Sequence, residues 1–358
     1  MKKGYLTMGL PKILIEFKTL AETIIKRSER GIVAIILRDN SNARASYSFA
    51  NESEVTKSHF TANNLSYLHL AFLGSPSKVI VERIGTEDTI DAVLERIKIK
   101  KWNYLTMPDA TSNELVALAA FITEQRDTFH KTFKLVAGNT AANHEGVINF
   151  TTTDIKVEGK TYSAEGFCPR IAGILAGMPV NRSATYYVLD EVDSITESET
   201  PDNDIDNGKL ILINDGVKIK IARGVNSRTT TTETRGEDFK KIKIVEAVDM
   251  IRDDIRSTFE DDFVGKVENS YDNKVVFVAA VNKYFRGLVK QGVLYDKFDN
   301  RAEIDIDGNR AWLEERKDIE DWDEEQIKTA NTGSTVFVKG NVQIQDAIED
   351  LNFKVYME

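Results

Sequence analysis

The clearest pattern in this sequence is an exchange between short apolar runs and amphipathic stretches over residues 79–136. The runs Val79–Val81, Tyr104–Thr106 and Phe133–Val136 have the length of buried strands. Between them, apolar residues recur at spacings of three and four, as on one face of a helix. These positions are Ile90, Val93, Leu94 and Ile97, followed by Leu115, Leu118, Ala119 and Ile122. The alternation predicts right-handed crossovers and a mostly parallel sheet.

Two segments next to this core differ sharply in pattern. Ile32 to Leu37 is continuously apolar and follows Gly31, which predicts a strand buried on both faces. Asn40 to Asn64 is rich in Ser, Asn, Ala and Thr, and we expect it to be exposed and irregular. Ser112 is the predicted cap of the second helix of the alternating region.

Two hairpins are predicted after the parallel region. Ile148 to Tyr162 alternates with many threonines and contains Gly159, whereas Leu210 to Ile221 turns at Asn214-Asp215-Gly216. Between them, Asp190 to Asp206 carries eight carboxylates and no basic residue, which is typical of a solvated loop.

A helix is predicted between these hairpins, with its apolar face in the range Phe167 to Met178. Pro169 is expected to lie in its first turn or to begin it, because proline lacks the N–H that an interior position needs. Gly173 and Gly177 would let this helix approach a neighbour closely.

The pattern changes to long helices beyond Gly236, and we predict a domain boundary near residue 238. Two sets of apolar residues fall at helical spacing, and Gly292 is the expected stop of the second helix. The sets are Ile244, Val248, Ile251, Ile255 and Phe259, and then Phe277, Val281, Tyr284, Phe285 and Leu288. Strand-like alternation returns at the end of the chain, in Val336/Val338, Val342/Ile344 and Leu351/Phe353/Val355/Met357.

Composition narrows the class of protein. The chain has 358 residues, 41% of them hydrophobic, and a formal net charge of −10. This acidity disfavours general nucleic-acid binding, which needs a concentrated basic face. A single cysteine excludes an internal disulfide framework, and the longest apolar run is too short to span a bilayer, so we expect no membrane insertion.

Catalytic chemistry has little support in the sequence. Cys168 with His144 is conceivable as a nucleophile and base, but a lone cysteine before a helix is more often a packing residue. The sequence has no phosphate-binding loop, serine elbow or dinucleotide fingerprint after any predicted strand. We therefore expect no catalytic residues and no cofactor.

One acidic motif approximates a calcium loop. Glu303-Ile304-Asp305-Ile306-Asp307-Gly308 with Glu314 has most of the spacing, but glutamate replaces aspartate at the first position. The alternation of Ile304 with Ile306 favours a strand that turns at Asp307-Gly308-Asn309. The sequence therefore predicts a plain hairpin and no metal.

A group of basic residues crosses the second hairpin and the segment after it. These are Lys218, Lys220, Arg223, Arg228 and Arg235. We expect them to complement the acidic stretch that precedes them, and docking to an acidic partner protein is the alternative. Because no aromatic residues interleave with them, nucleic acid is not the expected ligand.

The two chain ends are the most informative feature. The N-terminal segment alternates apolar Ile13, Ile15 and Phe17 with charged residues, so both ends resemble strands. A free terminal strand can add to the sheet of a neighbouring subunit, and a repeated head-to-tail contact of this kind produces rings or helical filaments. Pairing of the two ends inside one subunit is equally compatible with the pattern.

Several stretches in order along the chain resemble contractile-tail sheath proteins of myophages and phage-tail-like bacteriocins, of the short type found in Gram-positive hosts. They are GLPKILIEF (9–17), RGIVA (30–34), NHEGVINF (143–150), IARGVNS (221–227), KIKIV (241–245) with DMI (249–251), FVGKV (263–267) with NS (269–270), and ANTGS (330–334). The likeness extends from Met8 to the end of the chain.

The resemblance implies a mixed α/β fold in four parts. These are an N-terminal strand-exchange arm (1–30), an outer α/β domain of subtilisin-like but non-catalytic fold (31–238), an inner C-terminal domain (239–333) and a C-terminal strand arm (334–358). Strand exchange between subunits is expected at Ile13, Ile15, Phe17, Val336, Val338, Leu351, Phe353 and Val355.

The resemblance also implies a function. Hexameric rings would stack into a six-start sheath around a tail tube, with a baseplate and a tail terminator as further partners. The sheath would be assembled in the host cytoplasm, form part of the virion, and contract to drive the tube through the host envelope. The alternatives are an α/β enzyme of unknown activity and a binding module that is monomeric because its own ends pair.

Overall fold

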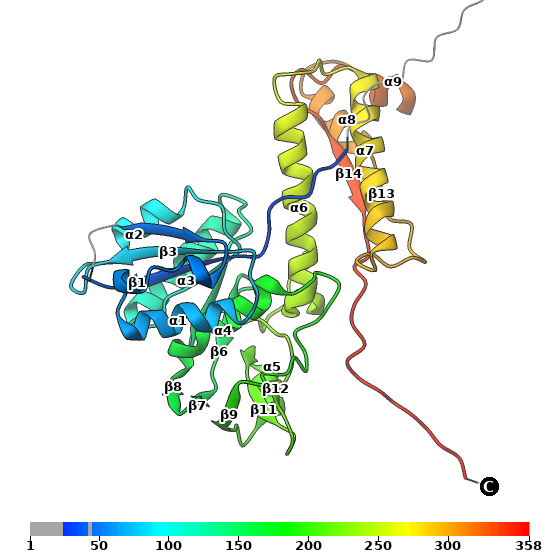
Figure 1. Cartoon of the computed structure of the whole chain (residues 1–358). Coiled ribbons are helices and arrows are strands. Elements are labelled where there is room, and N and C mark those ends of the chain that lie inside the picture. Colours follow the sequence, from blue (N-terminus) through cyan, green and yellow to red (C-terminus); the bar gives the residue numbers. More distant parts are fainter. Residues whose placement is uncertain (1–23, 42–44, 358) are drawn as a thin grey trace, which may run out of the picture.

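A seven-stranded sheet forms the centre of the larger part of the molecule, in the order β10-β6-β5-β4-β1-β3-β2 (Figure 1). The computed structural model describes residues 24–41 and 45–357. Neighbouring strands pair in parallel, except that β2 is antiparallel to β3. The strands are β1 (Ile32–Arg38), β2 (Ser46–Phe49), β3 (Lys78–Ile84), β4 (Tyr104–Thr106), β5 (Lys134–Gly138), β6 (Val147–Phe150) and β10 (Lys209–Leu210).

Helices cover both faces of this sheet. On one face lie α1 (Ala62–Phe72) and α4 (Ala164–Gly177), and on the other lie α2 (Asp91–Ile97) and α3 (Ser112–Asp127). Successive β1 side chains alternate between the two apolar cores: Val33 packs toward α1 and α4, and Ala34 toward α2 and α3. The predicted mixed α/β fold with a mostly parallel sheet is confirmed.

Helices α1 and α4 meet through glycines, as the sequence predicts. A Cβ atom placed on Gly173 would lie 2.1 Å from the Ala71 carbonyl oxygen, and one on Gly177 would lie 2.0 Å from that of Gly74. Real carbon atoms do not approach backbone oxygen so closely, and the obstacle is backbone rather than a movable side chain. Only glycine therefore allows this helix contact.

We expect Gly173→Ala to lower the free energy of unfolding by about 1–3 kcal/mol, because the added methyl group forces the two helices apart. Gly166→Ala in the same helix is the matched control, since its new Cβ would lie no closer than 3.5 Å to any neighbour. The control should be neutral or stabilising by about 1 kcal/mol, because alanine favours helix more than glycine does. Urea unfolding monitored by circular dichroism measures both, and equal destabilisation by the two variants would contradict the packing argument.

Two small antiparallel sheets and a short helix lie below the central sheet in Figure 1. β7 (Thr153–Val157) pairs with β8 (Lys160–Tyr162) and with β9 (Val192–Thr196), and β11 (Leu212–Asn214) pairs with β12 (Ile219–Ile221). Hairpins are confirmed within both predicted ranges, but the residues that begin each range are wrong, because Ile148 to Phe150 lie in β6 and Leu210 lies in β10, two parallel strands of the central sheet. The prediction of a loop at Asp190 to Asp206 is wrong, because β9 and α5 (Pro201–Asp206) lie within it. Backbone pairing to β7 holds β9 in place despite its acidic composition.

The C-terminal part is built on a long antiparallel helix pair. The helix α6 (Ile242–Asp262) rises from the α/β body, and α7 (Tyr271–Lys290) returns beside it (Figure 1). The antiparallel pair of β13 (Arg301–Ile304) and β14 (Val338–Asn341) packs on these helices around a core that includes Phe263, Phe277 and Leu288. The short helices α8 (Ile306–Glu314) and α9 (Glu324–Thr329) share a smaller core. The two predicted helices are confirmed, and Gly292 adopts a φ of 68° just after α7.

Several local predictions are wrong, each because tertiary packing decides the element. Within Asn40 to Asn64, β2 adds to the sheet edge and buries Tyr47 and Phe49, and two single-turn 3₁₀ helices follow it (Glu52–Glu54 and Lys57–His59). The cap of α3 is Thr111, whose side chain accepts from the Glu114 N–H in a capping box, and not Ser112. Glu303 and Ile304 lie in β13 as predicted, but the predicted turn at residues 307–309 is wrong, because these residues lie inside α8.

Helix α4 begins earlier than predicted. Ser163 caps it, and the helix starts at Ala164, so Pro169 lies in its interior. Proline there loses one backbone hydrogen bond, yet almost every residue of this helix is buried. Packing against the sheet and α1 outweighs that loss.

Candidate functional site

The C-terminal segment remains attached to the body for several residues beyond β14. The Tyr295 N–H donates to the Gln343 carbonyl oxygen at 2.8 Å, and the Gln345 N–H donates to that of Val293, also at 2.8 Å. An isolated antiparallel bridge joins Leu294 to Ile344. The chain therefore leaves β14 as an extended strap held by backbone hydrogen bonds.

The last attachment point of this segment is a group of polar contacts that we call the clasp. It consists of Ser183, Thr185, Arg223, Glu349 and Asp350. The hydroxyls of Ser183 and Thr185 both donate to the same Glu349 carboxylate oxygen, each at 2.7 Å. The Arg223 guanidinium pairs with Glu349 at 3.4 Å and with Asp350 at 2.5 Å. The clasp joins the segment to the α/β body, and these contacts raise the pKa of Arg223, above all through its hydrogen bond to Asp350.

Two lysines at the start of α6 hold the same segment from the other side. Lys241 forms an ion pair with Asp346, and the Lys243 ammonium donates to the Gln345 carbonyl oxygen. The segment is thus fixed at the base of α6 before it leaves the body. Charged hydrogen bonds are the stronger kind, so they give this departure point a defined direction.

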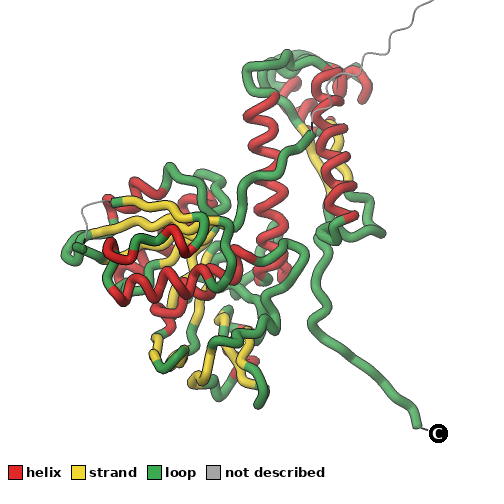
Figure 2. The backbone as a smooth tube through the Cα atoms, viewed as in Figure 1, coloured by secondary structure: helices red, strands yellow, loops and turns green. Residues whose placement is uncertain are grey.

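Residues 351–357 then project away from the body as an extended chain without helix or strand (Figure 2). The exposed fractions are 87% for Leu351, 77% for Phe353, 66% for Val355 and 93% for Met357. Within the described part of the chain, these residues make no hydrogen bonds. Large apolar side chains exposed together mark a surface that another molecule covers.

The N-terminal end of the described chain is anchored along α6. The Lys26 N–H donates to Thr258 Oγ1 at 3.1 Å, the Ser28 N–H donates to Asp254 at 2.7 Å, and Arg30 pairs with Glu246 at 2.5 Å. Because the residue numbers on α6 fall as those of the segment rise, the two run in opposite directions (Figure 1). The predicted strand residues Ile13, Ile15 and Phe17 lie outside the described residues.

The two terminal segments first meet α6 at different heights. The N-terminal segment reaches the helix near Thr258, and the C-terminal segment passes Lys243, fifteen residues earlier. At 1.5 Å per residue, this separation along the axis is roughly 22 Å. The N-terminal segment then follows the helix down to Glu246, close to Lys243, and no backbone hydrogen bond joins the described residues 24–30 to residues 345–350.

The other two predicted site residues lie against the chain's own C-terminal part. Val338 is opposite Ile304 in the β13–β14 pair, and Val336 lines an apolar pocket described below. Apart from Val342 and Ile348, the exposed apolar residues of the C-terminal segment begin at residue 351. Strand exchange by any of the eight predicted residues remains a prediction.

A buried cluster of charges fastens α6 to the α/β body. The Arg126 guanidinium makes two hydrogen bonds to the Asp249 carboxylate, at 2.9 and 3.0 Å, and Lys134 lies 2.9 Å from the same carboxylate. All three side chains are at most 4% exposed. Burial alone would raise the pKa of Asp249, but the two cations outweigh it and hold this pKa well below its usual range.

A second carboxylate on α6 extends the cluster. Glu246 accepts from the Tyr104 hydroxyl at 2.5 Å and pairs with Lys134 at 2.8 Å and with Arg30 at 2.5 Å. Burial would raise its pKa, and the two cations instead lower it. Arg30 lies on the N-terminal segment, so one network connects that segment, the sheet and the helix.

Part of the basic group predicted at the second hairpin belongs to the same region. Arg228 and Arg235 both pair with Glu145, which is 2% exposed, whereas Lys220 pairs with Asp215 in its own hairpin turn. Together with Arg223 in the clasp, these residues bind carboxylates outside Asp190 to Asp206. The expectation that the acidic stretch is their complement is therefore wrong for these four, because folding brings closer carboxylates to them.

No alternative chemistry is supported at the residues considered for it. The Cys168 thiol donates to the Ala164 carbonyl oxygen at 3.2 Å inside α4, and burial raises its pKa, which is the opposite of an activated nucleophile. His144 is engaged with Asp127 and the Gly146 N–H. Lys339 pairs with Asp305 and Asp307 of the suggested calcium loop.

In the described ranges, 24–41 and 45–357, no group of three His, Cys, Asp or Glu residues could hold a metal ion. Of the helices in that part of the chain, none is long and apolar enough to cross a membrane.

Anchored terminal segments, one of them ending in exposed apolar residues, are typical of a structural subunit that assembles with other subunits. Comparison with known proteins identifies the family. Residues 82–227 match the model of the phage tail sheath protein central domain, and residues 234–358 match that of the phage tail sheath C-terminal domain. The tail sheath protein of Clostridium phage phiCD119 is 37% identical over 98% of this chain and 99% of its own length. The chain belongs to the phage tail sheath family.

Solved structures show the same fold at low sequence identity. The sheath of the anti-feeding prophage in its contracted state matches with a TM-score of 0.70 at 13% identity, covering 98% of this chain and 100% of its own. The sheath tail protein of Desulfitobacterium hafniense matches with a TM-score of 0.68 at 16% identity, covering 82% and 93% respectively. The predicted family is therefore confirmed, and the chain is a structural sheath protein rather than an enzyme.

Sequence reasoning missed most of the residues that hold the terminal segments. The basic character of Arg223 was visible, but its partners Glu349 and Asp350 lie more than 120 residues away. Lys134 offered a clearer signal, because it is a lysine inside an otherwise apolar strand. A charged residue at such a position is almost never buried unless it is paired.

Proposed function

We propose that this chain polymerises into hexameric rings that stack as a six-start contractile sheath around a tail tube. Contraction of the sheath would drive the tube through the host cell envelope. The observation that carries the proposal is the exposed apolar segment 351–357, which projects from a firmly anchored base on a member of the sheath family. The tail tube, the baseplate and the tail terminator are its proposed partners, and its proposed location is the virion tail after assembly in the host cytoplasm.

The terminal arms would connect the subunits by exchanging strands, through the eight residues predicted above. Each backbone hydrogen bond of an added strand contributes on the order of 1 kcal/mol net, so one strand contributes several. Each subunit gives its arm to one neighbour and receives an arm from another, so the contact is heterologous. A heterologous contact propagates into rings or helices instead of closing into a dimer.

The anchoring of the arms also supports movement as a rigid body. The clasp and the buried charges fix the arms to the body on both sides of α6, and residues 351–357 remain free to follow a neighbour. A sheath built in this way could change its helical arrangement while neighbours stay connected. Release from a metastable extended state in one direction requires a kinetic barrier and no nucleotide.

We further propose that the helical part from Lys241 to Gly292 faces the tube and that the α/β body lies outside. This places the inner domain at residues 239–333, between the two arms. A cross-linking map of sheath on tube that placed Asp190 to Asp206 against the tube would reverse this orientation.

Electron microscopy of the purified chain tests the proposal. We expect hollow tubes or stacked rings in negative stain, together with large assemblies in sedimentation velocity. A species that stays monomeric at high protein concentration, with or without added tube protein, would contradict the assembly function.

A further inference from the structure

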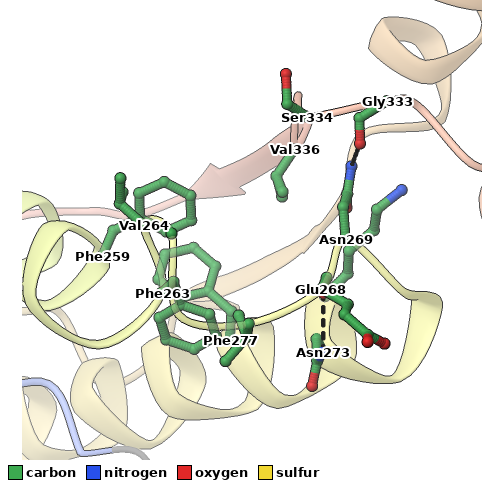
Figure 3. Close-up of a pocket in the computed structure, with 13 residues that line it drawn as sticks. Phe259, Phe263, Val264, Glu268, Asn269, Asn273, Phe277, Gly333, Ser334 and Val336 are labelled. Carbon is green, nitrogen blue, oxygen red and sulfur yellow. Dashed lines mark hydrogen bonds between the residues drawn. The ribbon is translucent and has the colours of Figure 1, made fainter.

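An apolar pocket of about 500 Å³ lies at the far end of the α6–α7 helix pair, away from the α/β body. Three phenylalanine rings, Phe259, Phe263 and Phe277, pack together on one side of it, with ring centroids 5.1 to 5.8 Å apart (Figure 3). Val264 and Val336 also line it, and Val264 is 56% exposed. Apolar side chains left open together mark a surface that a further segment covers.

A buried lysine without a counter-ion borders this pocket. Lys274 is 2% exposed, and its ammonium donates to the Ala330 carbonyl oxygen at 3.2 Å and to Thr332 Oγ1 at 3.1 Å. Among the described residues no carboxylate forms an ion pair with it, and burial lowers the pKa of Lys274. Buried charges are normally paired, so a carboxylate that arrives with another segment would be favoured here.

The same side of the pocket presents a hydrogen-bond acceptor without a donor. The Asn269 amide nitrogen donates to the carbonyl oxygens of Gly333, at 2.7 Å, and Thr335, at 3.0 Å, which fixes the orientation of the amide. Its oxygen is buried and has no hydrogen-bond partner among the described residues, so a backbone N–H would be favoured there. Figure 3 shows Asn269 and Gly333 across the pocket from the phenylalanine rings. Thr332, which binds Lys274, directly precedes Gly333, so both unmatched groups lie on this side.

The described chain begins beside this pocket. The Lys26 N–H donates to Thr258 Oγ1, on the helical turn that carries Phe259. Ile25 is buried in the apolar core that contains Phe263. Figure 1 shows this start of the chain running up α6 toward the far end of the helix pair. Since an extended chain advances about 3.3 Å per residue, the N-terminal arm starts within reach of the whole pocket.

The N-terminal arm also carries the groups that this pocket lacks. Ile15, Glu16 and Phe17 are consecutive, and in an extended chain the two apolar side chains share one face and the carboxylate takes the other. Such a strand can present its apolar face to the phenylalanine rings and its carboxylate to Lys274. Its backbone N–H groups can serve the Asn269 oxygen.

The C-terminal arm of the chain fits the pocket less well. Residues 351–357 contain Lys354 and no Asp or Glu, so they bring no counter-ion for a buried lysine. The clasp also holds this arm at the base of α6. Phe259 lies sixteen residues beyond Lys243, roughly 24 Å along the axis.

We propose that in the free subunit residues 13–23 fold back over this pocket of their own chain, with Glu16 beside Lys274 and Phe17 against the phenylalanine rings. The N-terminal arm is then held on its own subunit and is not available to a neighbour. Its release becomes a step before strand exchange, which slows spontaneous assembly. This consequence for assembly rests on the proposed sheath function, whereas the docking of the arm does not.

Disulfide cross-linking in the full chain tests the docking. Phe17→Cys and Val264→Cys are combined in one chain and oxidised mildly at micromolar concentration, in an equal mixture of isotope-labelled and unlabelled protein. We expect a disulfide within one chain, so mass spectrometry should find linked peptides of a single isotope composition. Linked peptides that mix the isotopes would overturn the proposal, because the arm would then belong to another copy. Absence of the link would overturn it as well.

Two controls make the cross-link specific. Val217→Cys replaces the pocket cysteine with one in the β11–β12 turn, where the side chain is 85% exposed. Phe353→Cys replaces the cysteine of the N-terminal arm with one in the C-terminal arm. A link as fast as that of Phe17→Cys with Val264→Cys in either control would contradict the docking. The native Cys168 is buried in α4, so it contributes little background.

Thermal unfolding tests the pairing of Glu16 with Lys274. Glu16→Gln should lower the Tm by about 2–4 °C, because the buried ammonium loses its counter-ion. In a Lys274→Met background the same change should leave the Tm unaltered. Glu22→Gln is the matched control on the same arm and should have no effect in either background. Equal shifts by Glu16→Gln in both backgrounds, or none in either, would refute the pairing.

Assembly kinetics separate this inference from the proposed function. Glu16→Gln frees the arm without removing its apolar side chains, so tubes should appear after a lag shorter by a factor of about three or more. An unchanged or longer lag would refute the restraint on assembly while leaving the sheath function intact. If the wild-type chain and this variant both fail to form tubes, the proposed function itself is contradicted, and the cross-link and the Tm still decide the docking.

Discussion

Deletion of residues 351–358 should leave a folded subunit that no longer forms tubes. The apolar side chains from Leu351 to Met357 are 66–93% exposed and contribute almost nothing to the chain's own core. The free energy of unfolding should therefore stay within about 0.5 kcal/mol of the wild-type value. Assembly should be lost, because the strand that we propose joins one subunit to the next is gone. Chemical unfolding, sedimentation velocity and negative-stain microscopy measure the two properties separately.

A matched pair of full-length variants tests whether the apolar face is responsible. Changing Leu351, Phe353 and Val355 to serine should abolish tubes, because these side chains lie together on one face of an extended chain. Changing Asn352 and Tyr356 to serine alters the opposite face and should preserve assembly. Tubes from the truncated chain, or equal loss in both substituted variants, would show that this segment does not connect subunits through its apolar face.

Asp249→Asn should destabilise the folded subunit by about 3–5 kcal/mol. The substitution keeps the size of the side chain but removes the charge that Arg126 and Lys134 share, and both cations are buried. A buried charge without its counter-ion costs far more than the net value of the intact pair. Since Asp249 joins α6 to the sheet, unfolding of α6 should accompany the loss. Urea unfolding followed by circular dichroism measures the difference.

The control for this variant is Asp261→Asn, the same chemical change on the same helix at an exposed position. It should alter the free energy of unfolding by no more than about 0.5 kcal/mol. A similar small effect from Asp249→Asn would show that the buried cluster does not hold the helix.

The wild-type chain and the Asp249→Asn variant should also differ in how their stability responds to acid. The pKa of Asp249 in the folded state is below its ordinary value of 3.8. The stability that depends on this lowered pKa is complete above the unfolded-state pKa and is lost as the pH falls toward the folded-state pKa. The unfolding free energy of the wild-type chain should therefore decrease below about pH 4, and that of Asp249→Asn should decrease less steeply.

Hydrophobic spacing was sufficient for the elements that are long or continuously apolar. Four elements were predictable for this reason: β1, α3, α6 and α7. Each buries at least one complete face, so apolar residues recur in the sequence at the spacing of that face. β2 was not, since its four residues, Ser46 to Phe49, follow a polar stretch and gain their place by pairing with β3. The start of α4 was hidden by Pro169, whose local preference is overruled by packing.

The candidate site also combines one feature that was visible in the sequence with contacts that only the folded chain creates. The alternation of Leu351, Phe353 and Val355 indicated a strand, whereas the structure shows an extended segment that pairs with no strand in the described part of its own chain. The clasp could not be predicted, because it joins Ser183, Arg223 and Glu349 from distant parts of the sequence. Contacts between residues so far apart in the sequence produce no local pattern of apolar and polar positions.

The sequence by itself determined the class of fold, the two long helices α6 and α7 of the C-terminal part, the apolar character of both chain ends and the resemblance to sheath proteins. These features depend on residues that are close together in the sequence or on patterns that repeat along it, so they can be recognised without the structure. Only the tertiary structure decided where the ends are anchored and which charges are buried against α6. Those properties depend on distances between residues far apart in the sequence, and such distances are set only when the whole chain packs.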